Sequence, residues 1–454
     1  MLLLAALVLT AAAWLRGAEY DEQYTLFLTA GTPRPDWPAT AFPAETVARA
    51  QTGHGTLSGI ARDLRATDVH PPLYFWAVSL WRLVFGPSLF AARMFSVLCG
   101  TISIGLLGAI ATRCGIRLAF PMLLTLGCYG FVYTNAVARG FAPAGMLTLG
   151  GAALLLRRRT VIAGLCFGAA CACNYLAVFA AAAVVAVTGA WVAIPAAIPF
   201  LALDGWFFAA QHAARDGQFP PFSFLSSIAR LATYQVASVF GGLPLYAYGA
   251  WRTAVGGIVA LAAVALAASI ARTRPWRANR MILAAAAAPP AGLLLLGATF
   301  NNTPIELRYL CFGLPFVALL AARAARPVLA CTLALQVLGI TGLLLSPRTM
   351  QPARIAAAEA VRLAPDTVVL LPAGNDGVGI VGAFGIEAPP AVQVLLIHPA
   401  DPIAARLASY RRVALALMAQ DPESTAAIAA AHNALANWHR VAAGSNLEVF
   451  ERGD

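Results

Sequence analysis

Long apolar runs separated by short polar turns fill the chain from residue 1 to about residue 345. A helix that crosses a bilayer needs roughly 20 apolar residues, so this pattern predicts about eleven membrane spans, several of them short. The first run has neither a basic stretch before it nor a small-residue cleavage site after it, so we interpret it as a retained span. The predicted spans lie near residues 1–17, 89–111, 118–136, 141–156, 160–173, 175–189, 190–210, 253–271, 281–299, 309–322 and 327–345.

The polar turns indicate an orientation, because basic residues close to spans collect on the cytoplasmic side of the membrane. Every basic residue of this chain is an arginine, and the arginines cluster in short groups between the apolar runs. With the N-terminus inside, all of the arginine-rich turns fall on the cytoplasmic side. These turns are residues 112–117, 157–159, 272–280 and 323–326.

Two apolar stretches do not fit as spans. Residues 71–87 offer about 14 helical residues between prolines, or about 21 Å, against roughly 30 Å of hydrocarbon. We therefore expect a helix that lies in the outer interface, anchored by Tyr74, Trp76 and Trp81. Residues 227–251 are expected at the outer surface or in a re-entrant element, because counting them as a span would turn residues 272–280 outward.

Two large regions are expected on the outer face: the first loop, residues 18–88, and the C-terminal tail, residues 346–454. Strand-like and helix-like segments alternate in the tail. One of its helix-like segments is "IAARLASYRRVALALMAQ", residues 403–420. The sequence thus predicts an all-α polytopic membrane domain over residues 1–345, followed by a small soluble α/β domain outside the membrane.

Composition supports a membrane protein: 60% of the residues are hydrophobic, 11% are charged, and the mean hydropathy is +0.74. The formal net charge of +11 does not indicate nucleic-acid binding, because the arginines occupy the positions of topology signals. The eight cysteines lie mostly in apolar segments and lack the spacing of a metal site, so we interpret them as packing residues.

Polar residues of the expected outer face gather at four places. Asp21 and Glu22 follow the first span, Asp68 and His70 precede the interfacial helix, Arg139 lies in a short turn, and Glu306 and Arg308 begin the tenth span. A carboxylate at the membrane boundary is partly desolvated, which suits it to take a proton from a hydroxyl. Arginine matches phosphate oxygens, and an Asp/Glu/His cluster is a ligand set for a divalent cation such as Mg²⁺ or Mn²⁺. The four places together suit a phosphorylated lipid.

Each of these residues also has a structural interpretation. The acidic pair can be the polar end of a span, His70 can be a turn residue, and boundary arginines commonly anchor to lipid headgroups. Asp204, in "LALDGWFF", is an acid inside an apolar run and so a functional candidate by position.

The order of these motifs resembles a known family. An acidic pair after span 1, "DVHPPLYFW" (68–76), "ARMFSVL" (92–98), an arginine turn and "LRYL" (307–310) look like the polyprenyl-phosphate-dependent glycosyltransferases of the GT-C type. That family includes the protein O-mannosyltransferases and the aminoarabinose transferase that acts on lipid A. The likeness covers residues 1–345 and is strongest over residues 18–160.

The resemblance implies an inverting sugar transfer at the outer face of a bacterial cytoplasmic membrane. The donor would be a polyprenyl-phosphate-linked sugar, and the acceptor a hydroxyl of an envelope lipid, glycan or protein. Asp21 matches the family's catalytic acid, with Glu22 beside it, and Arg308 with Tyr309 matches the Arg-Tyr motif that meets the donor phosphate. We expect Arg139 to be a second phosphate ligand, and Asp68, His70 and Tyr74 to shape the acceptor side. Asp21, Glu22, Asp68 and His70 are the candidate ligands of a cation.

The chain departs from the family in two places. The turn "VARGFAPAGM" (137–146) holds no acid, and the acid-lysine pair that precedes the prolines in the aminoarabinose branch is replaced by Val69-His70. These departures leave the sugar and the acceptor open. The alternatives are a secondary transporter, for which a helix break at "CNYL" (173–176) is the best feature, and a flippase partner in envelope glycan synthesis.

Overall fold

The computed structural model describes residues 1–211, 220–247, 249–274, 279–345 and 352–453. Part of the predicted 272–280 turn and the predicted boundary at residues 345–346 therefore lie outside the described residues. The chain forms two compact units. The helical unit comprises residues 1–15, 61–77 and 93–346, and the α/β unit comprises residues 16–60, 78–92 and 347–454.

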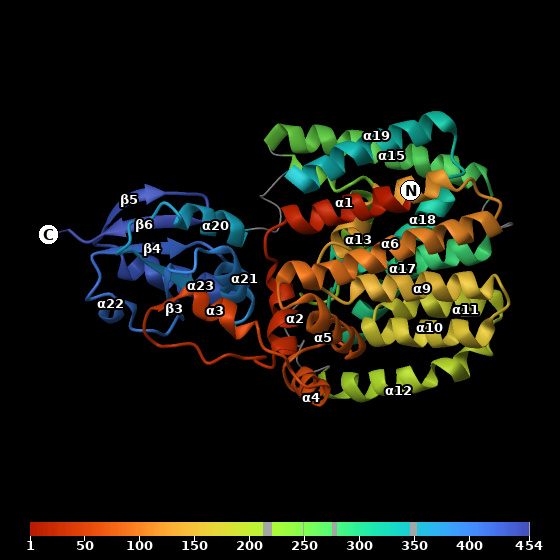
Figure 1. The fold of residues 1–454 in the computed structure, drawn as a ribbon. Coiled ribbons are helices and arrows are strands. Elements are labelled where there is room, and N and C mark those ends of the chain that lie inside the picture. The colour runs from red at the N-terminus through yellow and green to blue at the C-terminus, as the bar shows by residue number, and fades with distance from the viewer. Residues whose placement is uncertain (212–219, 248, 275–278, 346–351, 454) are drawn as a thin grey trace. The chain divides into compact units, whose positions relative to one another are not determined.

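Helices account for nearly all of the regular structure before residue 346 (Figure 1). In chain order they are α1 (Leu2–Leu15), α2 (Tyr20–Ala30), α3 (Ala44–Ala50), α4 (Leu57–Thr67), α5 (Leu73–Phe85), α6 (Leu89–Arg113), α7 (Ala119–Leu126), α8 (Tyr129–Thr134), α9 (Phe141–Leu155), α10 (Thr160–Cys173), α11 (Ala177–Thr188), α12 (Ala193–Gln211), α13 (Phe224–Val239), α14 (Leu243–Tyr246), α15 (Gly249–Arg272), α17 (Arg280–Phe300), η2 (Leu307–Leu310), α18 (Leu314–Ala321) and α19 (Arg326–Leu345).

The predicted apolar runs are all helical, but their lengths differ from the prediction. Within the described residues, α6, α12, α15, α17 and α19 are long and apolar enough to cross a membrane, and α1 with α2 makes a sixth if the pair counts as one bent span. The run 118–136 breaks at Gly127 and Cys128 into two short helices. The structure thus supports a multi-pass membrane protein, whereas the predicted count of about eleven spans stays a prediction.

The two short apolar stretches also form helices. The predicted interfacial helix is α5, with 13 residues, and its boundaries agree with the flanking prolines. The stretch 227–251 contains most of α13, all of α14 and the beginning of α15, with residue 248 outside the described residues. Their positions relative to the bilayer remain predictions.

A core of small and branched side chains holds α6, α9, α10 and α17 together. Helix α10 packs closely along both α9 and α12, and α11 along α17 (Figure 1). Gly164 makes one of these contacts possible, because a Cβ there would meet the Ala193 carbonyl oxygen at 2.1 Å. This tight packing fixes the ends of the helices from which the candidate residues project.

The α/β unit is built on a six-stranded sheet of order β1-β3-β2-β4-β6-β5. Strands β3, β2 and β4 run parallel, and the outer pairs are antiparallel. Its elements are β1 (Phe42–Pro43), α20 (Pro352–Ala360), β2 (Val368–Pro372), α21 (Gly379–Glu387), β3 (Gln393–Ile397), α22 (Ile403–Arg406), β4 (Arg412–Ala416), α23 (Pro422–Ala434), β5 (His439–Ala443) and β6 (Leu447–Glu451).

One segment of the tail was predicted wrongly. Residues 403–420 were expected to form one helix, but only Ile403–Arg406 is helical and Arg412–Ala416 is strand β4. The strand pairs with β2 on one side and β6 on the other, and four of its five residues are buried. Alternating small and branched residues fit either state locally, and burial between two strands decides for the strand.

Residues of the first loop are part of the α/β unit. Strand β1 pairs with β3, and helices α2 and α3 pack on α21. Glycines of α21 allow this packing, since a Cβ at Gly382 would meet Phe27 and Gln23 at 2.8 Å, and one at Gly385 would meet Val47 at 2.4 Å. The sheet and the first loop therefore share one hydrophobic core.

Candidate functional site

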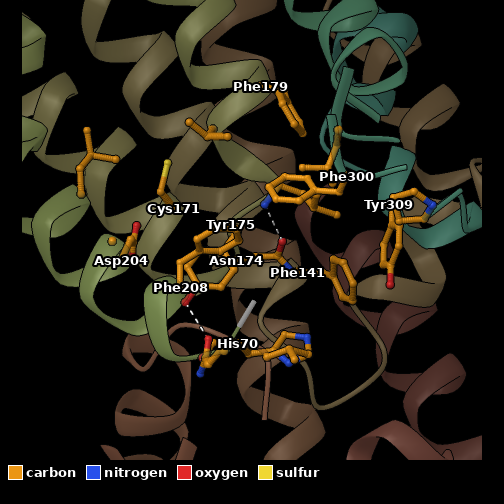
Figure 2. A pocket seen from close by; sticks show the side chains of 18 of the residues that line it. His70, Phe141, Cys171, Asn174, Tyr175, Phe179, Asp204, Phe208, Phe300 and Tyr309 are labelled. Atoms are coloured by element: carbon orange, nitrogen blue, oxygen red, sulfur yellow. Dashed lines mark hydrogen bonds between the residues drawn. The ribbon is translucent and has the colours of Figure 1, made fainter. Parts of the chain in front are cut away.

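A cavity of about 440 Å³ opens in the helical unit (Figure 2). Most of its wall is apolar, and α11, α12 and α17 contribute about half of the lining residues. Its aromatic residues include Phe141, Phe179, Phe208 and Phe300. Polar side chains interrupt that wall at a few points. They are His70, Asn174, Tyr175, Asp204, Gln211, Asn302 and Tyr309. An apolar cavity with a few polar groups suits an amphiphilic ligand.

The break between α10 and α11 supplies part of this polar lining. Helix α10 ends at Cys173 and α11 begins at Ala177, so the break predicted at residues 173–176 is present. Asn174 stabilises it by accepting a hydrogen bond from the Leu176 backbone amide (3.1 Å). The neighbouring Tyr175 hydroxyl donates to Gln211 Oε1 (2.9 Å).

Gln211, the last residue of α12, ties this wall to the segment that carries His70. Its amide nitrogen donates to the backbone carbonyls of Leu64 (2.9 Å) and His70 (3.0 Å). Because one side chain bonds both carbonyls and also accepts from Tyr175, it holds residues 64–70 in place against the cavity.

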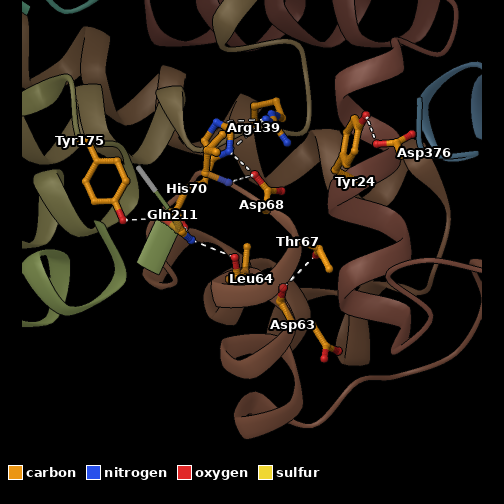
Figure 3. A network of polar contacts seen from close by, with 11 residues as sticks. Tyr24, Asp63, Leu64, Thr67, Asp68, His70, Arg139, Tyr175, Gln211 and Asp376 are labelled. Carbon is orange, nitrogen blue, oxygen red and sulfur yellow. Dashed lines mark hydrogen bonds and ion pairs between the residues drawn. The ribbon is translucent and has the colours of Figure 1, made fainter. Parts of the chain in front are cut away.

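Asp68, His70 and Arg139 form a chain of polar contacts (Figure 3). His70 Nδ1 lies 2.6 Å from Asp68 Oδ1, and the Arg139 guanidinium lies 3.0 Å from His70 Nε2. A guanidinium can only donate, so both contacts are satisfied together when Nε2 accepts and Nδ1 carries the proton toward Asp68. Asp68 also accepts from the Val69 amide at 2.6 Å.

The charges of this cluster set the ionisation of Asp68. Burial by itself would raise the pKa of the carboxyl, but His70 beside it and the positive charge of Arg139 hold the pKa of Asp68 well below its usual range. Asp68 Oδ2 is buried and has no hydrogen-bond partner among the described residues. The cluster therefore retains an ionised carboxylate with one acceptor atom unused.

Arg139 is placed by a tight turn between α8 and α9. Only 6% of its surface is exposed. At the next position a Cβ would lie 2.2 Å from the Cys173 carbonyl oxygen, so only Gly140 lets the turn approach the end of α10. The turn thereby brings the Arg139 guanidinium to His70, which lines the cavity.

Arg308 and Tyr309 occupy the short helix η2. Arg308 pairs with Glu306 at 2.7 Å, and its guanidinium carbon lies 5.6 Å from the centre of the Tyr309 ring. Tyr309 lines the cavity, where Figure 2 shows it on the opposite side of the view from Asp204. An anion that binds Arg308 has to compete with the Glu306 carboxylate.

The acidic pair of the first loop begins helix α2 in the α/β unit. Asp21 is half-buried in the first helical turn. Glu22 is fully buried and forms a capping box with Glu19, whose backbone amide donates to the Glu22 carboxylate at 3.1 Å. The two acids therefore differ in role, because the Glu22 carboxylate caps the N-terminus of α2.

Tyr74 is not among the residues that line the cavity. It is fully buried, with its ring 5.1 Å from Phe75 and 6.4 Å from Phe95. It therefore supports the segment after the proline pair through aromatic packing.

The predicted cation ligands belong to two units, Asp21 and Glu22 to the α/β unit and Asp68 and His70 to the helical unit. No group of three or more His, Cys, Asp or Glu side chains that could hold a metal occurs within the residues that the structure describes. At the Asp68–His70 pair, the Arg139 guanidinium lies where a cation would meet like charge. On its own the pair does not suit a divalent ion, and the cation stays a prediction.

Several residues that line the cavity were not predicted as site residues from the sequence. Asn302 and Gln211 carried no motif, and Asn174 and Tyr175 were noticed only as part of a helix break. Asp204 was noticed as an intramembrane acid, and it now lies in the cavity wall with both carboxylate oxygens buried and unpartnered among the described residues. A search for polar residues at helix breaks and helix ends would have found most of these.

The chain has a GT-C type membrane fold. It matches the crystal structure of ArnT from Cupriavidus metallidurans in the apo state with a TM-score of 0.53 and 13% identity, over 100% of this chain and 98% of that one. The match to ArnT bound to undecaprenyl phosphate has a TM-score of 0.51 and 13% identity, over 99% and 98%.

A third structure, the arabinofuranosyltransferase AftD from mycobacteria, is more distant. Its TM-score is 0.41 with 15% identity, and the match covers 100% of this chain and 40% of that one. No protein-family model matches the sequence, and no curated protein matches it significantly by sequence.

Proposed function

We propose that the protein is an inverting glycosyltransferase that moves a sugar from a polyprenyl-phosphate donor to an acceptor hydroxyl at the outer face of the bacterial cytoplasmic membrane. The observation that carries the proposal is the end-to-end fold likeness to ArnT, of which one structure holds undecaprenyl phosphate. The amphiphilic cavity of the helical unit supports it, because the donor has the same division into an apolar chain and a charged head.

The donor lies with its prenyl chain along the phenylalanine-rich wall and its sugar phosphate toward His70 and Tyr309. Arg139 neutralises the phosphate, and Arg308 exchanges Glu306 for a phosphate oxygen when the donor binds. Asn174, Asp204 and Asn302 are available for the hydroxyls of the sugar.

In the transfer step, the oxygen of the acceptor hydroxyl attacks the anomeric carbon from the face opposite the phosphate. The bond between that carbon and the phosphate oxygen breaks, and the configuration inverts. Asp21 accepts the hydroxyl proton, and the electron pair leaves with the polyprenyl phosphate, whose added charge the arginines stabilise. Glu22 holds the first turn of α2, on which Asp21 stands. The role of Asp21 rests on its match to the family's acid.

The proposal is tested by transfer of a labelled sugar from synthetic polyprenyl-phosphate donors to an envelope lipid extract, with the purified full chain in nanodiscs. Asp21→Asn is expected to reduce transfer by a factor of 100 or more, on the scale of lost general-base catalysis. Asp36→Asn makes the same chemical change at an exposed position of the same loop and is expected to have no effect. Equal transfer by Asp21→Asn and wild type would show that Asp21 is not the base.

The fold likeness to ArnT does not favour the transporter interpretation. The helix break at residues 174–176 contributes Asn174 and Tyr175 to the cavity that also contains His70. The same nanodisc preparation distinguishes the two functions, because a transporter or flippase moves lipid-linked sugar between leaflets without breaking its phosphate bond.

A further inference from the structure

Four arginines surround a second cavity of the helical unit, with a volume of about 570 Å³. Arg113 ends helix α6, and residues 157–159 join α9 to α10. All four side chains are exposed, and none has a hydrogen bond or ion pair with another residue that the structure describes. The rest of the lining is apolar and consists of Leu154, Leu156 and Ile162.

The backbone of this turn holds an arginine in an unfavourable conformation. The amides of Arg158 and Arg159 close the end of α9 by donating to the carbonyls of Leu155 and Leu154, both at 2.9 Å, in a Schellman motif. Arg158 is consequently left-handed, with φ of 59°. At the equivalent position helices α2 and α11 have glycine, Gly31 and Gly189. The chain keeps a cationic side chain where glycine would be less strained.

The N-terminus of α10 adds to the positive field. Its N-cap is Arg159, and no side chain caps the free amides of the first turn. Ile162, in that turn, lines the cavity. A helix of 14 residues presents partial positive charge at this end, which favours a bound anion.

The walls of the cavity are rigid. Ile110 and Ala111 of α6 share a buried core with Ala152 of α9 and Ala163 of α10. The guanidiniums therefore project from three helix ends whose spacing is fixed by packing, although they come from positions more than 40 residues apart in the chain.

We propose that this cavity binds the phosphate headgroup of an anionic phospholipid. Unpartnered arginines provide the phosphate ligands, and the leucine and isoleucine wall receives the first part of an acyl chain. Helix α6 is long enough to cross the bilayer, so Arg113 at its end lies at the boundary between hydrocarbon and headgroups. A free anion would gain nothing from the apolar wall. The site is separate from the proposed transfer reaction and does not depend on it.

The test is native mass spectrometry of the detergent-solubilised full chain titrated with phosphatidylglycerol and, separately, phosphatidylcholine. The variant Arg113→Gln/Arg157→Gln/Arg159→Gln is expected to bind phosphatidylglycerol at least about tenfold more weakly, because each arginine near an anionic membrane surface adds to the attraction. Binding of phosphatidylcholine should not change. The control Arg272→Gln/Arg274→Gln, which removes two arginines from another exposed arginine-rich turn, should retain phosphatidylglycerol binding.

A single substitution separates binding from folding. Arg158→Gly removes one guanidinium and relieves the left-handed strain, so it is expected to weaken phosphatidylglycerol binding while the melting temperature stays equal or rises. Unchanged phosphatidylglycerol binding in the triple variant would overturn the proposal. Equal loss of both lipids, or displacement of the lipid by equimolar inorganic phosphate, would also overturn it.

Discussion

Arginine appears in two contrasting settings within the helical unit. Arg139 is almost completely buried, and its guanidinium contacts His70, which in turn contacts Asp68. The arginines at residues 157–159 and at 113 are exposed and have no side-chain partner among the described residues. A buried, paired arginine is held in one geometry at the cost of desolvation, whereas exposed ones retain their capacity to bind. The comparison predicts that loss of the buried Arg139 lowers stability, whereas loss of the exposed arginines weakens lipid binding without lowering stability.

The largest effect is expected from removing the buried guanidinium. Arg139→Met leaves the Asp68 carboxylate and His70 without their cation in a buried position, and should lower the free energy of unfolding by about 2–4 kcal/mol. Thermal unfolding of the purified chain measures this. Arg139→Lys keeps the charge but loses the planar fork of donors, so its free energy of unfolding should lie between those of Arg139→Met and wild type. A melting temperature unchanged in Arg139→Met would remove the distinction between the two settings.

The next effect concerns acid pH. Because the folded-state pKa of Asp68 is lowered, its stabilising contribution is full above the ordinary aspartate pKa of about 4. That contribution is lost as the pH falls from about 5 toward the folded pKa, by on the order of 2 kcal/mol. Asp68→Asn should therefore be less stable than wild type at pH 7 and show a flatter decline below pH 5. Parallel pH profiles would count against the role of the cluster.

A smaller effect, of opposite sign, is expected for Arg158→Gly. The left-handed conformation costs a residue with a Cβ about 1 kcal/mol, and glycine avoids that cost while losing some stability through its more flexible unfolded state. A net gain of up to about 1 kcal/mol is expected. The control Arg157→Gly, at an ordinary backbone position, should lose stability.

The smallest effect is expected for Arg113→Gln/Arg157→Gln/Arg159→Gln. Exposed side chains without partners contribute little to folding, so the free energy of unfolding should change by less than about 0.5 kcal/mol. Chemical denaturation in a neutral detergent provides the comparison. A loss of several kcal/mol would show that these arginines are structural.

Much of this organisation could be predicted from the sequence because it depends on local pattern. Composition and the residues that break helices are enough to predict the apolar runs, the proline-bounded helix α5 and the break after Cys173. The motif that holds Asp68 and His70, and the arginine turn at Arg139, were identified as candidates. Their direct contact, across about 70 residues, required the fold.

The remainder depended on tertiary packing. Strand β4 was predicted as helix because its small and branched residues satisfy either periodicity, and only pairing with β2 and β6 selects the strand. The capping role of Glu22 required the exact start of α2, which sequence patterns rarely locate. Gln211 is tied to the site by hydrogen bonds to the backbone carbonyls of Leu64 and His70. Because every residue has a backbone carbonyl, residue identities do not indicate such contacts.

The packing of α2 and α3 on α21 has a consequence for biosynthesis. A chain made from its N-terminus completes residues 16–60 long before residues 368–397, yet β1 pairs with β3, and the Ala18 amide donates to Glu387 at 2.6 Å. Helix α2, which carries Asp21, therefore stays incompletely packed until nearly the whole polypeptide has been synthesised. Premature termination anywhere before β3 leaves that helix without its partner surface, so a truncated product has no finished α/β unit.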